Sequence, residues 1–525
     1  MTREEELAGE ARKVTRAAVL ISIGNIASRA LGLVREMAKS YFFGAGGAVS
    51  AFDVASQVPT MFYDQLVGGM LSSSLVPVFS DYAHAKDQED FWHLLSSMLT
   101  LVGGFLGVVV LAVAWLSPWV ARILGRGLDP QYLDLASSMI RITAPAIFCL
   151  NIAGLITAVL HARQRFALPA LTGAIYNATM VVVVVLFARG RLGTQTLALG
   201  LLVASVMQVL FQLPGLRGMQ WRKPFPLHPA LRKVGYLYLP IGLGLLVDQF
   251  AVALSFNLAS RTGPSGIAWM KYAATLIQFP LGLVVTAVSV AILPTLSRYA
   301  VTDEAAFRET LARGLRLVLI LVLPAAVALW VMAEPLVALI LQRGEFMPSD
   351  TLATANALRF SILGLVFAAL DQPLIFAFYA RKDTWTPALV GVGTVLLYLG
   401  MAVVPTLLHT PRLWELILAN SLKLMAHALL MLWLFARKVG TLKDYNVVRT
   451  TGLSLVASVI MALPIARILY VLESVVPSGA LGYAIRLAVA GGIGALVYLL
   501  LLRWMGFEEI ALLRNALRRQ GEGRA

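Results

Sequence analysis

Four charged residues lie close together near the start of the chain, in a segment that is otherwise apolar enough to enter a membrane. The segment 27–40 reads ASRALGLVREMAKS and carries Arg29, Arg35, Glu36 and Lys39. Counted from the last basic residue before the apolar run, Arg29 lies about 20 Å along a helix, in hydrocarbon that is about 30 Å thick. A lone charge at that depth costs several kcal/mol, so such side chains normally face a water-filled cavity or a partner. The segment therefore predicts either a cavity for a charged ligand or an internal ion pair that fastens helices.

The composition is that of a membrane protein. Over 525 residues the chain has 59% hydrophobic and 14% charged residues, with a mean hydropathy of +0.78. A soluble domain has about 25% charged residues. The first apolar run begins near Lys13 and has no small-residue cleavage site, so we interpret it as a retained helix and not as a secretory signal.

The sequence gives little support for catalysis. It contains no phosphate-binding loop, no HExxH, no GxSxG and no metal-ligand cluster, and its one cysteine, Cys149, cannot form an internal disulfide. We therefore expect no enzyme activity, no metal and no cofactor. Energy for any transport would have to come from the membrane potential or from a Na⁺ or H⁺ gradient.

The elements that must position these charges are helices. We predict an all-α polytopic membrane protein, because apolar spans of about twenty residues recur along the chain and no strand pattern competes with them. The second and fourth spans are long enough to be tilted or broken, at Gly68-Gly69 and Pro145. The fourteen predicted spans are 14–43, 50–80, 92–117, 132–160, 167–188, 194–214, 234–260, 267–297, 314–334, 351–380, 386–407, 412–436, 449–470 and 480–503.

Basic residues are distributed unevenly between the loops. Arg and Lys are concentrated in alternate connections, at 163–165, 217–233, 298–316, 381–382 and 437–443. By the positive-inside rule these connections are cytoplasmic, which places both termini in the cytoplasm. The formal charge of +15 lies mostly in such loops, so we expect contacts with membrane lipids and none with nucleic acid.

The chain also contains an internal repeat. HARQRFALPALTG at 161–173 aligns without a gap on YARKDTWTPALVG at 379–391, and VPVFSDY at 76–82 aligns on LPTLSRY at 293–299 at nearly the same separation. Two such matches indicate a duplication. We predict two six-helix lobes, 1–230 and 231–440, related by a pseudo-two-fold axis along the membrane normal, with the substrate between them. Residues 441–525 would then be two additional helices and a basic cytoplasmic tail.

Several motifs resemble one known family. SRALGLVRE at 28–36, RFALPA at 165–170, AEPLVALILQRGEF at 333–346 and FYARKDTWTP at 378–387 are similar to the MurJ/MviN family of lipid II flippases. The resemblance implies a monomer of the bacterial inner membrane. It also implies that undecaprenyl-pyrophosphate carrying the peptidoglycan precursor is flipped to the outer leaflet by alternating access of the two lobes.

The resemblance extends to individual residues of the first helix. Ser28, Arg29 and Arg35 match the family motif, and Glu36 stands where the family usually has Asp. In the family these residues belong to a cavity that holds the pyrophosphate, so the resemblance assigns them to substrate binding.

Two other cavity positions depart from the family. Tyr63 and Thr275 stand where the family has arginines. Lys271 is four residues before Thr275 and therefore on the same helix face, so it could return a positive charge to the cavity. It would act as a point charge rather than as a bidentate fork. We expect Tyr63, Lys271 and Thr275 to line the cavity with Arg29 and Arg35.

One carboxylate could couple transport to an ion. Asp248 lies in the middle of the seventh span, where a carboxylate is a common ligand for Na⁺ or H⁺; an ion pair with Lys271 or Arg35 would explain it equally well. Three activities remain in competition at this point. They are a lipid II flippase or a flippase for another polyprenyl-linked oligosaccharide, a cation-coupled multidrug exporter, and an enzyme that processes polyprenyl lipids.

Overall fold

The computed structural model describes residues 3–68, 75–83, 88–223 and 229–507. Within these ranges the chain is helical apart from turns and loops, which confirms the predicted all-α fold. Contacts between helices divide the chain into two compact units, Met1–Ala268 with Gly344–Phe346 and Trp269–Arg343 with Met347–Ala525. The lobe boundaries at 230 and 440 rest on the sequence repeat and stay a prediction.

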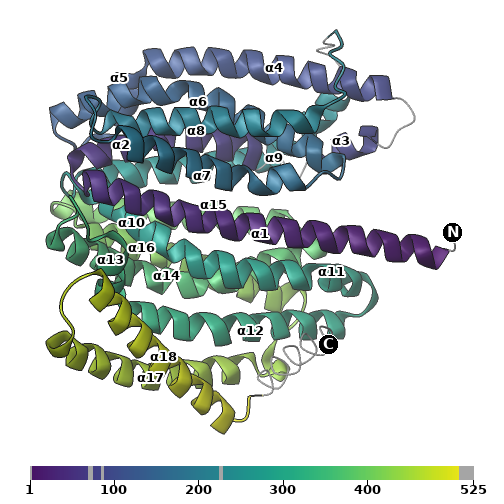
Figure 1. Ribbon diagram of the computed structural model, residues 1–525. Helices are drawn as coiled ribbons and strands as arrows, with labels where there is room; N and C mark the ends of the chain where they lie inside the picture. Colours follow the sequence, from purple (N-terminus) through teal and green to yellow (C-terminus); the bar gives the residue numbers. More distant parts are fainter. Residues whose placement is uncertain (1–2, 69–74, 84–87, 224–228, 508–525) are drawn as a thin grey trace. The chain divides into compact units, whose positions relative to one another are not determined.

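In the first unit, α1 lies along α7, and α6 packs on both α2 and α8 (Figure 1). A buried apolar cluster that includes Phe79, Phe91 and Trp92 joins α3 and α4 to the end of α6. The helices of this unit are α1 (Arg3–Phe43), α2 (Gly47–Tyr63), α3 (Val76–Ala83), α4 (Gln88–Trp115), α5 (Ser117–Gly125), α6 (Pro130–Ala162), α7 (Ala167–Phe187), α8 (Gln195–Gln212) and α9 (Pro229–Ser260), with the π-helical η1 (Asp64–Gly68) and the 3-10 helix η3 (Leu213–Leu216).

In the second unit, α14 packs on α16 and α12, and the stacked rings of Phe307 and Phe435 lie in its core. The last two helices pack on α12, where the Tyr498 hydroxyl donates a hydrogen bond of 2.8 Å to the Ile320 carbonyl. The helices are α10 (Gly266–Pro280), whose first turn belongs to the first unit, α11 (Thr286–Thr302), α12 (Glu304–Val331), α13 (Ala333–Leu341), α14 (Pro348–Ala380), α15 (Trp385–Leu408), α16 (Leu413–Lys438), α17 (Val447–Val475) and α18 (Ala480–Trp504), with the π-helical η4 (Leu281–Val285) and the 3-10 helix η5 (Lys443–Tyr445).

Helix boundaries support the duplication. The helices α6 and α14 have 33 residues each and begin at Pro130 and Pro348. The next two helices of each unit begin after the same number of residues, α7 and α8 at Ala167 and Gln195, α15 and α16 at Trp385 and Leu413. The repeat in the sequence thus corresponds to a repeat of helix starting positions, although α7 has 21 residues and α15 has 24.

Two helices are interrupted at corresponding places. The π-helical segment η1 follows α2, η4 follows α10, and each lies at the same distance before the repeated segments at 76–82 and 293–299. The break expected near Gly68-Gly69 therefore falls on η1, although Gly69 lies outside the described residues. The other long span is not broken, since α6 continues through Pro145.

Eleven of the described helices are long and apolar enough to cross a membrane, and each corresponds to a predicted span. The other three predicted spans correspond to α1 and to the interrupted segments around η1 and η4. The π-helical interruptions divide two of these segments into shorter helices. The count of fourteen spans thus stays a prediction. The basic tail lies outside the described residues.

Candidate functional site

The charged segment of α1 is held against α7 by a close helix contact. Small residues recur every four positions on α1, at Gly24, Ser28 and Gly32. A Cβ atom at Gly24 would lie 2.0 Å from the Ala170 carbonyl oxygen of α7, and one at Gly173 would lie 2.5 Å from Ser28 Oγ. Only glycine permits this approach, and small residues are the usual means by which membrane helices pack closely.

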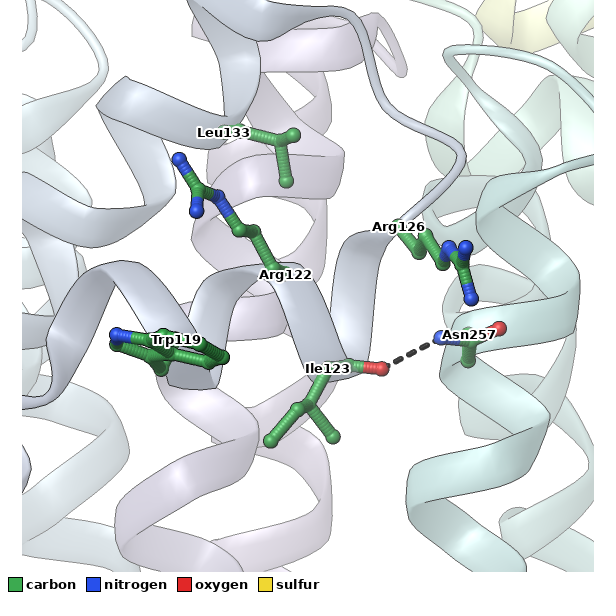
Figure 2. Close-up of a pocket in the computed structure, with 6 residues that line it drawn as sticks. All are labelled: Trp119, Arg122, Ile123, Arg126, Leu133 and Asn257. Atoms are coloured by element: carbon green, nitrogen blue, oxygen red, sulfur yellow. Dashed lines mark hydrogen bonds between the residues drawn. The ribbon is translucent and has the colours of Figure 1, made fainter.

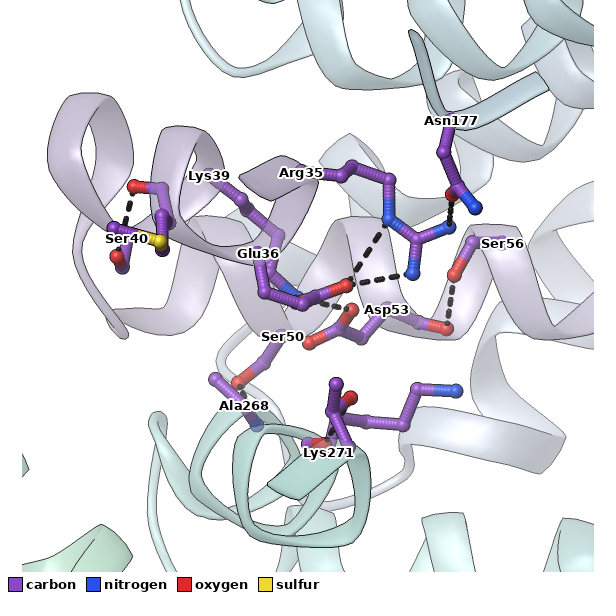
Figure 3. A network of polar contacts seen from close by, with 12 residues as sticks. Arg35, Glu36, Lys39, Ser40, Ser50, Asp53, Ser56, Asn177, Ala268 and Lys271 are labelled. Carbon is purple, nitrogen blue, oxygen red and sulfur yellow. Dashed lines mark hydrogen bonds and ion pairs between the residues drawn. The ribbon is translucent and has the colours of Figure 1, made fainter. Parts of the chain in front are cut away.

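This contact places an asparagine beside the charges. Asn177 of α7 is 8% exposed; its Nδ2 donates to the Ser28 carbonyl at 3.0 Å, and its Oδ1 accepts a hydrogen bond from Arg35 Nη1 at 3.0 Å. The Arg35 guanidinium also donates to Glu36 Oε1, through Nε at 3.2 Å and Nη2 at 2.7 Å (Figure 3). Two neighbours on different helices therefore fix the plane of the guanidinium.

The same network continues into α2. Lys39 Nζ lies 2.8 Å from Glu36 Oε2 and 3.1 Å from Asp53 Oδ1, so the lysine bridges two carboxylates (Figure 3). Two cations and two anions are thus joined, and their charges cancel. Because every member has an oppositely charged neighbour, the cost of removing them from water is largely offset.

Exposure distinguishes Arg35 from the rest of the network. Its side chain is 27% exposed, whereas those of Glu36, Lys39 and Asp53 are 8%, 3% and 2% exposed. A guanidinium has five N–H donors, and the contacts to Glu36 and Asn177 leave donors on both terminal nitrogens. Arg35 can therefore bind an anionic ligand while the other three charges hold it in place.

The predicted site residues are only partly brought together. Ser28, Arg35 and Glu36 share the network, and Arg29 is half-buried two turns before Arg35 on α1. Tyr63 is half-buried at the end of α2.

Lys271 and Thr275 lie on α10 in the second unit, where the Thr275 hydroxyl donates to the Lys271 carbonyl at 3.0 Å. That they share a cavity with the arginines of α1 stays a prediction. The expectation that they lie on one face of one helix agrees with this hydrogen bond, which joins consecutive turns.

Three members of the network were not among the predicted site residues. They are Lys39, Asp53 and Asn177. The spacing of Lys39 from Glu36, three positions along one helix, is a signal that they can pair. The contacts to Asp53 and Asn177 join different helices, so no local spacing in the sequence could identify them.

Asp248 is exposed on α9, and its proposed role stays a prediction. The alternative partner Arg35 is bonded to Glu36 and Asn177, and no ion pair joins it to Asp248 in the described part of the chain. Within the described residues there is also no group of three His, Cys, Asp or Glu side chains that could hold a metal ion.

A separate pocket of about 520 Å³ lies between α5, the start of α6 and α9 (Figure 2). Trp119, Arg122, Arg126 and Asn257 line it, and Asn257 Nδ2 donates to the Ile123 carbonyl at 2.6 Å. None of the predicted site residues contributes to it, so the ion network remains the candidate site of the first unit.

Comparison with known proteins identifies the family. The family model described as lipid II flippase MurJ matches residues 39–490. The chain belongs to the MurJ family. The match includes Lys39, Asp53 and Asn177 and the motifs at 165–170, 333–346 and 378–387, and it confirms the family resemblance. The first-helix motif at 28–36 lies before the matched residues. As a MurJ family member, the protein is a multi-pass transporter of the bacterial inner membrane and not an enzyme.

Similar proteins agree with this assignment. A probable lipid II flippase MurJ of Haemophilus influenzae is 30% identical over 391 residues, which cover 70% of this chain and 76% of that protein. The lipid II flippase MurJ of Burkholderia cenocepacia is 30% identical over 393 residues, covering 73% and 76% of the two chains.

Solved structures show that the fold is shared more widely. A lipid II flippase MurJ in an inward closed conformation has a TM-score of 0.78 at 22% identity, covering 92% of this chain and 98% of that one. An inward-facing multidrug transporter of the MATE family has a TM-score of 0.68 at 14% identity, covering 82% and 99%. At these identities the likeness concerns the fold alone.

Proposed function

We propose that this protein moves lipid II from the cytoplasmic to the outer leaflet of the inner membrane by alternating access. The observation that carries the proposal is the match to the MurJ family over residues 39–490. The two named relatives are a probable lipid II flippase and a lipid II flippase, and this chain aligns with 76% of each. Membrane lipids are the protein's environment and the lipid-linked glycan is its cargo.

The site we propose for the pyrophosphate is centred on Arg35. Its guanidinium is oriented by Glu36 and Asn177 and is the most exposed group of the buried network. A guanidinium binds phosphate oxygens in a bidentate manner, and a preoriented one loses less entropy on binding. Arg29, with Ser28 beside it, is the second cation of this site on α1.

Lys271 supplies a further positive charge from the second lobe in this proposal. Tyr63 and Thr275 would lie beside the cargo, although neither side chain is cationic. In this proposal the pyrophosphate contacts the guanidinium groups of Arg29 and Arg35 and the ammonium group of Lys271. The tail of the lipid and the sugars must be held by other parts of the protein.

We also propose that the protein works as a monomer with both termini in the cytoplasm and without nucleic acid. Its loops carry the basic residues expected of the cytoplasmic side. The energy comes from the membrane potential or from a Na⁺ or H⁺ gradient, since one charge moved through 100 mV yields about 2.3 kcal/mol. The position of Asp248 in the seventh span predicts that it binds the ion.

The test is complementation of a strain depleted of its lipid II flippase, followed by transport in liposomes. Expression of this protein should restore growth, and the purified protein should move fluorescent lipid II to the opposite leaflet. If lipid II fails in both assays and another polyprenyl-linked oligosaccharide is moved, that oligosaccharide is the cargo instead. Export of cationic drugs without lipid II movement would instead identify a multidrug exporter.

A further inference from the structure

The second unit contains a buried pair of ionisable groups that the proposed function does not use. Asp371 of α14 and His427 of α16 face each other, with His427 Nδ1 2.7 Å from Asp371 Oδ1. Both side chains are 12% exposed. Histidine is the side chain type whose charge most readily changes between pH 5 and 8. The contact therefore joins a carboxylate to a group that can gain or lose one proton.

The pair lies far from both ends of its helices. At 1.5 Å per residue, Asp371 is about 14 Å from Ala380 at the end of α14, and His427 is about 17 Å from Lys438 at the end of α16. The hydrocarbon is about 30 Å thick, so these depths correspond to the middle of the membrane. Ionisable groups at that depth are costly, and they commonly mark proton or ion pathways.

Other charged and titratable groups near the pair are few. On the same helix faces lie Lys423, one turn before His427, and Tyr379, which interacts electrostatically with Asp371. From α15, Tyr398 lies under the Lys423 ammonium, 5.9 Å from it to the ring centroid. In the neighbouring helices the charged residues lie near helix ends. They are Glu334 in the first turn of α13, Arg298 near the end of α11, and the charged residues of α12 between Glu304 and Arg316.

The internal repeat argues against a purely structural role. The helices α6 and α8 correspond to α14 and α16, and Ala153 of α6 corresponds to Asp371. There Gln212 of α8 donates a hydrogen bond of 3.1 Å to the Ala153 carbonyl. A neutral contact is thus sufficient to fasten this pair of helices. In the second unit Ser421 Oγ already provides one, to the Phe360 carbonyl at 2.8 Å, so packing does not require the ionisable pair.

The geometry of the ring indicates where a proton would bind. With Nδ1–H donating to the Asp371 carboxylate, the neutral ring has its free electron pair on Nε2. Nε2 faces Gly391 of α15, and a Cβ atom added to Gly391 would lie 3.9 Å from it. Because glycine has no side chain, position 391 leaves this nitrogen uncovered.

We propose that Asp371 and His427 form a proton-binding site that couples transport to the pH gradient. Water on one side of the membrane gives a proton to Nε2, and the imidazolium is stabilised by the Asp371 carboxylate. After the conformational change, Nε2 returns the proton to water on the other side. One proton is bound and released in each cycle, and no other reactant is needed. The inference requires a transporter but not a particular cargo.

The test uses the full-length protein in liposomes with the membrane potential clamped. A His427→Gln variant keeps a donor towards Asp371 but cannot titrate. The matched control is His409→Gln, because His409 follows the end of α15, is exposed, and lies 3.7 Å from Glu415 in the first turn of α16. The measurement is the ratio of fluorescent lipid II between the two leaflets at steady state, with an imposed pH gradient or an imposed Na⁺ gradient.

One proton per cycle permits a change in this ratio of up to about tenfold for each unit of pH gradient. The wild type and His409→Gln should respond to the pH gradient, and His427→Gln should equilibrate lipid II with no response. A wild type driven by Na⁺ and not by pH would overturn the proposal. A pH response that persists in His427→Gln would also overturn it. If Asp248→Asn abolishes that response, the proton-binding residue is Asp248 instead.

A second readout does not depend on the cargo. Ring nitrogen NMR of the labelled protein, with His427→Gln to assign the signal, reports protonation of each imidazole. The His427 signal should change between a neutral and a doubly protonated ring over the same pH range in which a pH gradient drives transport. A His427 ring that stays in one protonation state over that range would overturn the proposal even if lipid II is transported. Failure of lipid II transport with a titrating His427 would instead reject the cargo.

Discussion

Buried charges are arranged differently in the two units. In the first, Arg35, Glu36, Lys39 and Asp53 form a network of two basic and two acidic side chains that contains no histidine. In the second, the buried pair contains a histidine. The first arrangement presents a constant guanidinium, whereas the second can exist with two different net charges. A fixed charge can hold an anionic ligand, whereas a titratable group can respond to a pH gradient.

The largest expected effect comes from removing the fixed charge itself. Arg35→Ala should lower lipid II transport by about two to four powers of ten, because two charge-assisted contacts worth about 1.5–3 kcal/mol each are lost. Glu36 keeps Lys39 as its partner, so the protein should still fold. Transport in liposomes is the measurement.

Arg141→Ala is the control for this change, since Arg141 lies in α6 of the same unit and its Nε donates to Ser117 Oγ at 2.9 Å. It should leave transport almost unchanged. If Arg35→Ala and Arg141→Ala lose the same amount of transport, Arg35 has no special role in binding the cargo.

A second change tests whether the buried part of the network is structural. Lys39→Met should lower the free energy of unfolding by about 3–5 kcal/mol, because Glu36 and Asp53 lose the ammonium between them. Adding Asp53→Asn should restore part of the stability. Thermal unfolding in detergent measures both.

The control here is Arg313→Ala, which breaks an exposed ion pair with Glu309. Such a pair is worth about 0–1 kcal/mol. If Lys39→Met has the same free energy of unfolding as this control, the network does not stabilise the fold, contrary to our interpretation.

A third change adds a fixed charge on the second unit. Thr275→Arg should tighten lipid II binding about tenfold to a hundredfold, through one more charge-assisted contact of about 1.5–3 kcal/mol. Adding Tyr63→Arg should strengthen it further unless the adjacent Asp64 neutralises the gain. Native mass spectrometry with added lipid II measures the effect, and Thr302→Arg, at an exposed position at the end of α11, is the control. Unchanged or weaker binding by Thr275→Arg would show that position 275 does not face the phosphate.

The smallest expected effect concerns a carboxylate outside the membrane helices. Burial by itself would raise the pKa of Asp383, but hydrogen bonds from Lys438 at 2.8 Å and from Thr386 outweigh it, so the pKa is lowered from its usual value of 3.8. A carboxyl whose pKa is lower in the folded state stabilises the protein above the unfolded pKa, and this contribution is lost as the pH falls through the folded pKa.

The wild type should therefore lose slightly more stability than Asp383→Asn on acidification below about pH 4. Melting temperatures measured across that range check it. Parallel curves for the two proteins would contradict the assigned role of Asp383.

Hydropathy alone was enough to locate most of the fold, because eleven spans are continuous apolar helices. The length of the second span and Gly68-Gly69 indicated a break where η1 lies, but nothing in the sequence indicated η4, since an extra residue in one turn leaves no periodic signal. For the site, the residue types of α1 predicted Arg35 and Glu36, because their burial requires partners. The partners Asp53 and Asn177 are on other helices, and His427 resembles any histidine in an apolar segment until its contact with Asp371 is known.

The matched π-helical segments have a geometrical consequence for motion. A π turn contains one residue more than an α turn, and its hydrogen bonds join residues five apart. If η4 changed to α geometry, the surplus residue would pass into the next turn, and α11 would rotate by about 100° about its axis relative to α10. η4 is thus a point at which one helix end can change the face it presents while its backbone stays hydrogen-bonded, and η1 follows α2 at the corresponding place of the first unit.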